Sequence, residues 1–198
     1  MELKNATMYH FWDRRIISSN WSKGATFTID KDYKTYECKD ITPIDLNLPT
    51  VEKIIEYQKM LKNNDLFLTN NDKLVIREKM LELYRAKYLP NEISRMHCMY
   101  FCDENSLMYW RRMFPSYFDL YEVKLNGVAF KSSAKLLPHI SNCNKHTFKE
   151  MEELCRAYWN PNLMDENLCC FAEYLFQGEV YVKKKTNVNN VRSRYMYH

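Results

Sequence analysis

The stretch Ala172-Glu173-Tyr174-Leu175-Phe176-Gln177-Gly178-Glu179-Val180-Tyr181-Val182 decides how the fold is interpreted. It is rich in aromatic and aliphatic residues and is interrupted by one glycine, which predicts a pair of strands near the C-terminus. At the other end, the aromatic segment 7–12 (TMYHFW) predicts a first strand. Strands at both ends with helices between them predict an α+β fold rather than alternating β/α units.

The residues between these ends carry both helix and strand patterns. Capping residues and apolar periodicity predict helices over about 51–61, 72–88, 103–113 and 148–158. Alternating patterns predict further strands over 25–29, 93–101 and 117–124, the last followed by Asn126-Gly127, a hairpin-turn signal. No repeat or low-complexity linker divides the chain, so we expect one domain over residues 1–198, with a basic C-terminal tail from about 183.

Composition excludes several classes of protein. The chain has 198 residues with 46% hydrophobic and 27% charged side chains, which is typical of a globular domain with a sizeable core. Its three glycines, Gly24, Gly127 and Gly178, lie far apart, so neither a P-loop nor a dinucleotide-fold glycine motif is present. The net charge of +4 permits a nucleic-acid partner without requiring one.

The chain shows no targeting or metal-binding pattern. The first twenty residues lack the apolar core of a signal peptide, and no apolar run reaches the length that spans a bilayer. We therefore expect a cytoplasmic protein without membrane partners. Its seven cysteines are then expected to be reduced, and because their spacings match no zinc motif, no metal site is expected.

Two polar residues inside apolar strands are candidates for chemistry. Glu173 is flanked by Phe171, Ala172, Tyr174 and Leu175, so it is either held in a cleft for electrostatic work or faces solvent at a sheet edge. His10 ends an aromatic strand, where histidine is more often a packed core residue.

Three segments in chain order resemble the signature of ADP-ribosyltransferases of the His–Tyr–Glu branch, which includes diphtheria-toxin-like enzymes. They are Tyr9-His10, the stretch from Ser94-Arg95 to Tyr100-Phe101, and Ala172–Leu175. The resemblance implies split antiparallel β-sheets with helices between the strand groups. It also implies NAD as co-substrate, with a strand-borne histidine on the ribose, a tyrosine on the nicotinamide and a glutamate on the ribose 2′-hydroxyl.

The resemblance assigns residues to these roles. The catalytic residues that it implies are His10, Tyr100 and Glu173, and the NAD-binding residues are Tyr9, His10, Arg14, Ser94, Arg95, Tyr100 and Tyr109. A pyrophosphate oxygen suits the Arg95 guanidinium. Many arginine- and asparagine-modifying relatives carry Glu or Gln two residues before the catalytic glutamate. Phe171 occupies that position before Glu173. Gln177-Gly178-Glu179 does fit the pattern, which makes Glu179 the alternative catalytic carboxylate.

A second resemblance spans most of the chain. The segments 78–85, Ser94-Arg95 and Tyr158-Trp159 are similar to a family of uncharacterised bacterial proteins near the same fold. Together, the two resemblances imply a mono-ADP-ribosyltransferase that modifies a macromolecular acceptor, protein or nucleic acid, with a toxin or defence role as one possibility.

Two other functions stay open on this fold. One is a non-catalytic binding or inhibitor module, in which His10 and Glu173 only pack. The other is an enzyme that removes a phosphate from RNA with NAD. The basic residues after 183, interleaved with Tyr195 and Tyr197, resemble a nucleic-acid-contacting tail, with a solvated terminus as the alternative.

Overall fold

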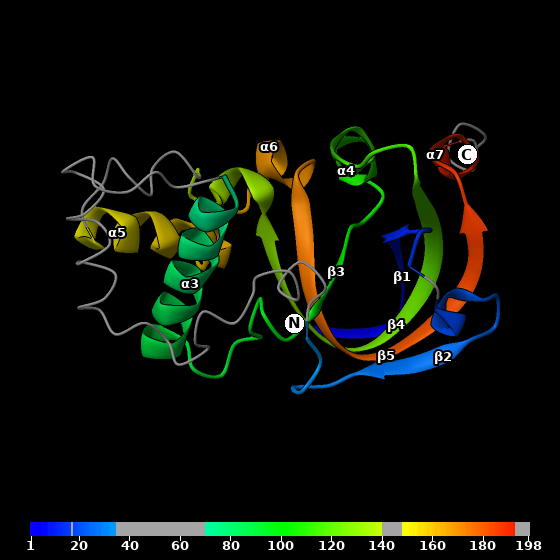
Figure 1. Ribbon diagram of the computed structural model, residues 1–198, viewed down its shortest axis with the longest axis horizontal. Helices are drawn as coiled ribbons and strands as arrows, with labels where there is room; N and C mark the ends of the chain where they lie inside the picture. The colour runs from blue at the N-terminus through cyan, green and yellow to red at the C-terminus, as the bar shows by residue number, and fades with distance from the viewer. Residues whose placement is uncertain (17, 35–69, 140–147, 193–198) are drawn as a thin grey trace. The chain divides into compact units, whose positions relative to one another are not determined.

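A computed structural model describes residues 1–16, 18–34, 70–139 and 148–192 (Figure 1). Contacts divide the chain into two compact units. Unit 1 contains Met1–Tyr33, His97–Lys135 and Met164–His198, and unit 2 contains Lys34–Met96 and Leu136–Leu163.

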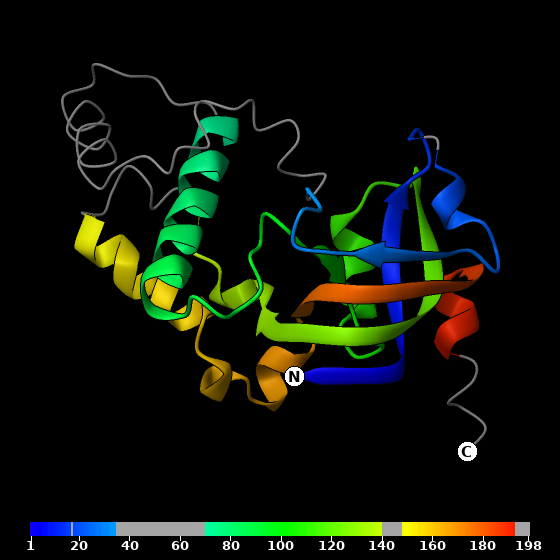
Figure 2. The same cartoon turned by 90° about the horizontal axis from the view of Figure 1, so that it is seen from below.

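Unit 1 is built on one antiparallel sheet of five strands: β1 (Glu2–Asp13), β2 (Thr26–Ile29), β3 (Met99–Phe101), β4 (Phe118–Ser133) and β5 (Ala172–Thr186). The strand order is β1-β4-β5-β2, and β3 pairs with β5 as well. An isolated pair, Tyr9 with Cys102, joins the end of β3 to β1 through two backbone hydrogen bonds of 2.9 Å. The pairings β1–β4–β5–β3–β1 therefore close into a ring, around which the strands curve (Figures 1 and 2).

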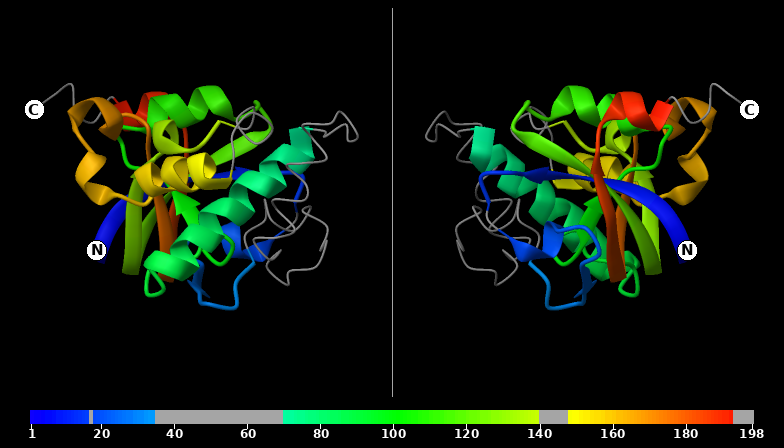
Figure 3. Two further views of the ribbon diagram at one scale, coloured as in Figure 1. Left: turned by 90° about the vertical axis from the view of Figure 1, so that its left-hand side faces the viewer. Right: turned by 90° about the vertical axis from the view of Figure 1, so that its right-hand side faces the viewer.

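Short helices complete unit 1. They are η1 (Ser19–Trp21), α4 (Leu107–Met113), α6 (Glu166–Cys169) and α7 (Val188–Arg192), and η2 (Ala134–Leu136) begins at its boundary. Helices α4 and α7 contact each other and lie side by side in Figure 3. Unit 2 holds α3 (Asn70–Tyr88), α5 (Phe148–Tyr158) and η4 (Pro161–Leu163), with α3 packed against α5.

The sheet buries different side chains on its two faces, because successive residues of a strand point to opposite sides. One face, which we call the tryptophan face, carries Trp21 and the alternate residues Phe101, Tyr174 and Phe176. The other, the α4 face, carries Tyr9, Phe11 and Cys102 against Leu107 of α4 and Val191 of α7. In β1 the alternation changes phase at a bulge between Leu3 and Ala6, where Asn5 has a φ of 49°.

Two glycines face each other where β4 and β5 pair. Gly127 lies opposite Gly178, and their φ angles are 156° and 141°. A Cβ atom on Gly178 would lie 2.4 Å from the Asn126 carbonyl oxygen, and one on Gly127 would lie 2.3 Å from that of Gln177. The ring of Phe176 packs over both positions, so the close approach of the two strands requires glycine on each.

The lysines expected to begin a tail belong to β5. The β4–β5 register skips Lys183, so Lys183 and Lys184 both reach the fully buried carboxylate of Glu122, at 2.7 and 3.7 Å. Strand pairing continues to Thr186, and α7 follows. The expected boundary at about 183 was wrong because the sequence does not reveal the buried acid that holds these lysines. Residues 193–198 lie outside the described residues.

Several predicted elements are confirmed. The α+β class is correct, and α3 and α5 match the helices expected over 72–88 and 148–158. The segments 7–12 and 25–29 lie in or overlap β1 and β2, and α4 covers the second half of 103–113. The helix expected over 51–61, like its cap Thr50, lies outside the described residues. The five cysteines that the structure describes are free.

Three predicted details were wrong. Asn126-Gly127 forms no hairpin, since β4 runs straight through it to Ser133. Residues 172–182 form one strand rather than two, because Gly178 serves the close contact with Gly127 instead of a turn. Of 93–101, only Met99–Phe101 is strand.

Replacing Gly178 with alanine is expected to destabilise unit 1 strongly. The new methyl group meets backbone on the opposite strand and adds backbone strain, together about 3 kcal/mol of unfolding free energy. Gly24→Ala is the matched control, because Gly24 also has a positive φ of 86° but nothing within 4 Å, which predicts a loss of only about 1 kcal/mol. Urea unfolding followed by circular dichroism measures both, and equal losses would contradict the close-contact explanation.

Candidate functional site

Glu173 is a buried carboxylate at the beginning of β5. Only 3% of its surface is exposed, and it lies opposite the equally buried Ser132 of β4. Tyr174 and Phe176 point to the tryptophan face, so the alternation places Glu173 on the α4 face. Burying a carboxylate is costly, so a carboxylate in such surroundings either binds a structural partner or stabilises a positive charge in a ligand.

Helix α4 lies over this end of β5. The indole Nε1 of Trp110 donates a 2.7 Å hydrogen bond to the carbonyl of Ala172, and the ring of Tyr109 packs edge-on against Phe171 at 4.9 Å. Burial raises the pKa of the Tyr109 phenol, and the negative charge of Glu173 raises it further. Tyr109 and Glu173 therefore belong to one electrostatic environment.

The position of α4 is set by the turn that precedes it. Asp103 Oδ1 accepts hydrogen bonds from the backbone N–H of Ser106, at 2.9 Å, and from its hydroxyl, at 2.8 Å. This local side-chain bonding fixes the chain between β3 and α4. The tyrosine on α4 is thereby held at a defined place beside the sheet.

Tyr100 and Tyr9 approach Glu173 through the strand register. Tyr100 pairs with Leu175, two residues after Glu173 on the same strand, so both side chains point to the α4 face. Tyr9 pairs with Cys102, which follows the Phe101–Tyr174 pair, and it is buried on the α4 face as well. The structure therefore brings three of the predicted aromatic residues, Tyr9, Tyr100 and Tyr109, to the face that carries Glu173.

His10 lies on the opposite face. Its ring stacks on Trp21 at 4.6 Å and contacts Phe101 at 5.4 Å. Its Nδ1 lies 2.7 Å from the carbonyl oxygen of Tyr100; because this oxygen only accepts, Nδ1 carries the hydrogen. Burial lowers the pKa of His10 to about 4, partly offset by this bond, so the ring is neutral at pH 7.

The expectation that His10, Tyr100 and Glu173 converge on one cleft needs correction. His10 contacts the backbone of Tyr100 from the tryptophan face, whereas Glu173 points to the α4 face. The motif spacing could not reveal this, because the side on which a strand residue points depends on register and bulges.

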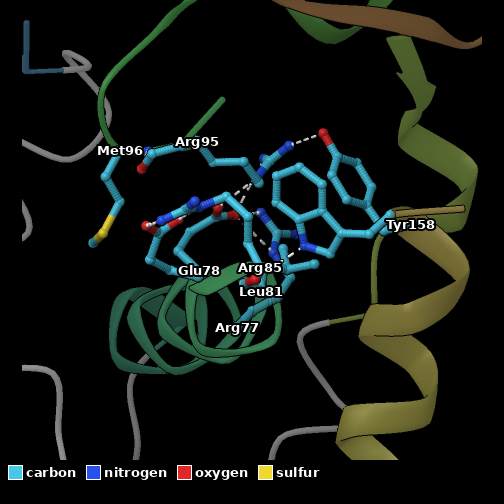
Figure 4. A network of polar contacts seen from close by, with 10 residues as sticks. Arg77, Glu78, Leu81, Arg85, Arg95, Met96 and Tyr158 are labelled. Carbon is cyan, nitrogen blue, oxygen red and sulfur yellow. Dashed lines mark hydrogen bonds and ion pairs between the residues drawn. The ribbon is translucent and has the colours of Figure 1, made fainter. Parts of the chain in front are cut away.

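Arg95 and Ser94 belong to unit 2. Figure 4 shows Arg95 between two partners: its Nε donates to Glu78 at 2.8 Å, and its Nη1 donates to the hydroxyl of Tyr158. Arg77 also donates to Glu78, at 2.7 Å, and the Ser94 hydroxyl accepts from the backbone N–H of Met96. The guanidinium is 3% exposed and engaged, so this geometry does not support the expected pyrophosphate contact.

The remaining predicted residues are exposed. Arg14 follows β1, and its backbone N–H donates to the carbonyl of Tyr117 at 3.3 Å. Glu179 is exposed on β5, opposite Thr28 and Asn126. Of the two candidate carboxylates, Glu173 is therefore the one in low-dielectric surroundings, where electrostatic work is strongest.

One polar cluster, around the side chain of Tyr174, was not predicted. The hydroxyl of Tyr174 donates to Asp103 Oδ2 at 2.8 Å, and the Lys131 ammonium lies 3.9 Å from the same oxygen and 5.3 Å from the Tyr174 ring. Burial and the Asp103 charge raise the pKa of Tyr174. The three residues lie far apart in sequence, so no local signal could have revealed the cluster.

In the parts of the chain that are described, no three His, Cys, Asp or Glu side chains gather as metal ligands, and no helix is long and apolar enough to cross a membrane. The family model described as "Protein of unknown function (DUF2441)" matches residues 3–188. No curated protein matches the chain.

The neutral His10 predicts a pH dependence of stability. Its folded pKa of about 4 lies below the ordinary value of 6.5, so the unfolded chain binds the proton first and stability falls as the pH drops from 6.5 toward 4. The fall reaches at most about 1.4 kcal/mol per pH unit from this group. Urea unfolding across this range should show a steeper dependence for the wild type than for His10→Asn, and parallel curves would contradict the assignment of a neutral ring.

Proposed function

The chain belongs to the family whose model it matches, a family of unknown function, and we propose that it is an NAD-dependent mono-ADP-ribosyltransferase with its site at Glu173. The observation that carries the proposal is the 3% exposed carboxylate of Glu173 on the α4 face, whose charge raises the pKa of the Tyr109 phenol. The resemblance of Tyr9-His10, Tyr100-Phe101 and Ala172–Leu175 to the His–Tyr–Glu signature supports it. An ADP-ribosyltransferase-like fold is part of the proposal.

The reaction moves ADP-ribose from nicotinamide to an acceptor. The bond between ribose C1′ and the nicotinamide nitrogen breaks, its electron pair leaves with neutral nicotinamide, and an acceptor nucleophile bonds to C1′ and loses its proton. The transition state resembles the oxocarbenium ion of glycoside hydrolysis. A buried anion near C1′ stabilises that positive charge, because a low dielectric strengthens the interaction.

Four residues on the side of the sheet that faces α4 have roles in this proposal. Glu173 accepts a hydrogen bond from the ribose 2′-hydroxyl and stabilises the charge that develops at C1′. Tyr109 and Tyr100 supply the aromatic surface for nicotinamide, with Tyr9 behind them. Only 3% of Glu173 is accessible, so NAD binding displaces part of this aromatic cover.

His10 acts at a distance in this arrangement. Its bond to the Tyr100 carbonyl fixes β3 relative to β1, so we assign it a positioning role rather than a contact with NAD. Arg95 stabilises unit 2 through Glu78 and Tyr158 and has no part in the reaction.

The alternative is a non-catalytic binding module on the same fold. The burial of Glu173 is the observation that favours it, since a buried carboxylate opposite Ser132 also serves packing. NAD binding distinguishes the two proposals, because only the enzyme needs it.

Nicotinamide release from NAD by the purified chain tests the enzyme. Glu173→Gln keeps the side-chain shape and removes the charge, so release is expected to fall by about 100-fold or more. Glu179→Gln makes the same change at an exposed position of the same strand and is expected to leave release unchanged.

Two results would contradict the transferase. One is equal loss in both variants, and the other is the absence of NAD binding by calorimetry together with the absence of release. The second result would favour the binding module. Thermal unfolding of each variant, measured beside the assay, separates a catalytic loss from a folding loss.

A further inference from the structure

Positive charge gathers where β1 ends and β4 begins. Asp13 at the end of β1 pairs with Phe118 at the beginning of β4, so the loops that follow and precede them are neighbours. Among the described side chains, Arg14, Arg15, Arg111, Arg112 and Lys185 lie on the elements that meet here, and we call this group the basic end.

Three cations of the basic end contact the loop that carries Tyr117. Arg15 lies 3.9 Å from the centre of the Tyr117 ring, and the backbone N–H of Arg14 donates to the Tyr117 carbonyl. Arg111 donates to the carbonyls of Phe114 and Pro115, at 3.2 and 3.5 Å, in the loop that leads to Tyr117. Arg15 therefore lies over the Tyr117 ring, and Arg14 and Arg111 bind the backbone beside it.

The carboxylates nearby neutralise only part of this charge. Asp13 pairs with Arg15, and Asp119 pairs with Lys185 at 2.7 Å. Among the residues that the structure describes, Arg14, Arg111 and Arg112 form no ion pair, although the charge of Arg14 also lowers the pKa of Asp13. Arg14 and Arg112 are also exposed, so the basic end offers guanidinium groups to an anion from solution.

The stacked pair of Arg15 and Tyr117 narrows the class of ligand. Both groups are planar, and unpaired bases stack on such planes, whereas the bases of a duplex are stacked on one another already. Guanidinium groups bind phosphate oxygens in a bidentate manner. Phosphates beside exposed planar bases are the chemistry of a single-stranded nucleic acid, and an acidic peptide lacks the bases.

We propose that the basic end binds single-stranded nucleic acid and presents it as the acceptor. Arg112 is three residues after Tyr109 on α4, so the two positions are neighbours on the helix surface. A strand on the basic end therefore continues along α4 toward Glu173. The role of the nucleic acid as acceptor rests on the proposed transferase function, but binding of the nucleic acid to the basic end needs no NAD.

Fluorescence anisotropy with a labelled single strand of about 15 nucleotides tests the binding without NAD. The protein is the full chain carrying Glu173→Gln, so catalysis plays no part. Binding is expected to weaken as salt rises from about 50 to 200 mM, and to be stronger for the single strand than for the same sequence as a duplex. Arg14→Ala with Arg112→Ala should weaken it about tenfold and lower the salt slope by about two.

Lys23→Ala with Lys31→Ala is the matched control. Both lysines are exposed in unit 1 near β2, so the pair removes the same charge away from the basic end and should leave the affinity within about twofold. Equal weakening by both pairs would overturn the proposal, because it would show an effect of net charge alone. No binding, a preference for duplex, or equal binding of polyglutamate would overturn it as well. These results leave the nicotinamide assay unaffected, so the failure of either proposal is recognised separately.

Discussion

The close approach of β4 and β5 at Gly127 and Gly178 is the constraint on which unit 1 depends. Strand β5 pairs with β4 along its whole length, and its other edge accepts β3 and then β2. A side chain at either glycine would meet the backbone of the other strand. Without this contact, β4 and β5 could not keep the register in which β1, β4, β5 and β3 pair into a closed ring.

That register also determines which residues share a face. It places Glu173 and Tyr100 toward α4 and places His10 among Trp21 and Phe101 on the other side. The two polar groups of the candidate site are thus separated by the sheet and connected through the Tyr100 backbone. A histidine that is neutral at pH 7 and fixed by one carbonyl serves better to position a strand than to bind an anion.

The sequence predicted the elements better than their pairing. The helices over 72–88 and 148–158 could be predicted because the apolar periodicity that indicates a helix lies within the helical segment itself. The α+β class follows from the order of strands and helices along the chain. Asn126-Gly127 was misleading because a glycine needed for strand contact looks the same as one needed for a turn. Arg95 next to Ser94 suggested an anion site, but Glu78 and Tyr158, which occupy it, lie 17 and 63 residues away. Side-chain partners so distant in sequence leave no local pattern.

NAD binding on the α4 face at Glu173 can be seen in a crystal structure of the chain with a carbocyclic NAD analogue, which cannot release nicotinamide. We expect the ribose hydroxyls within hydrogen-bond distance of the Glu173 carboxylate and the nicotinamide ring against Tyr109. An analogue bound at Ser94 and Arg95, or against the His10 ring on the tryptophan face, would contradict it.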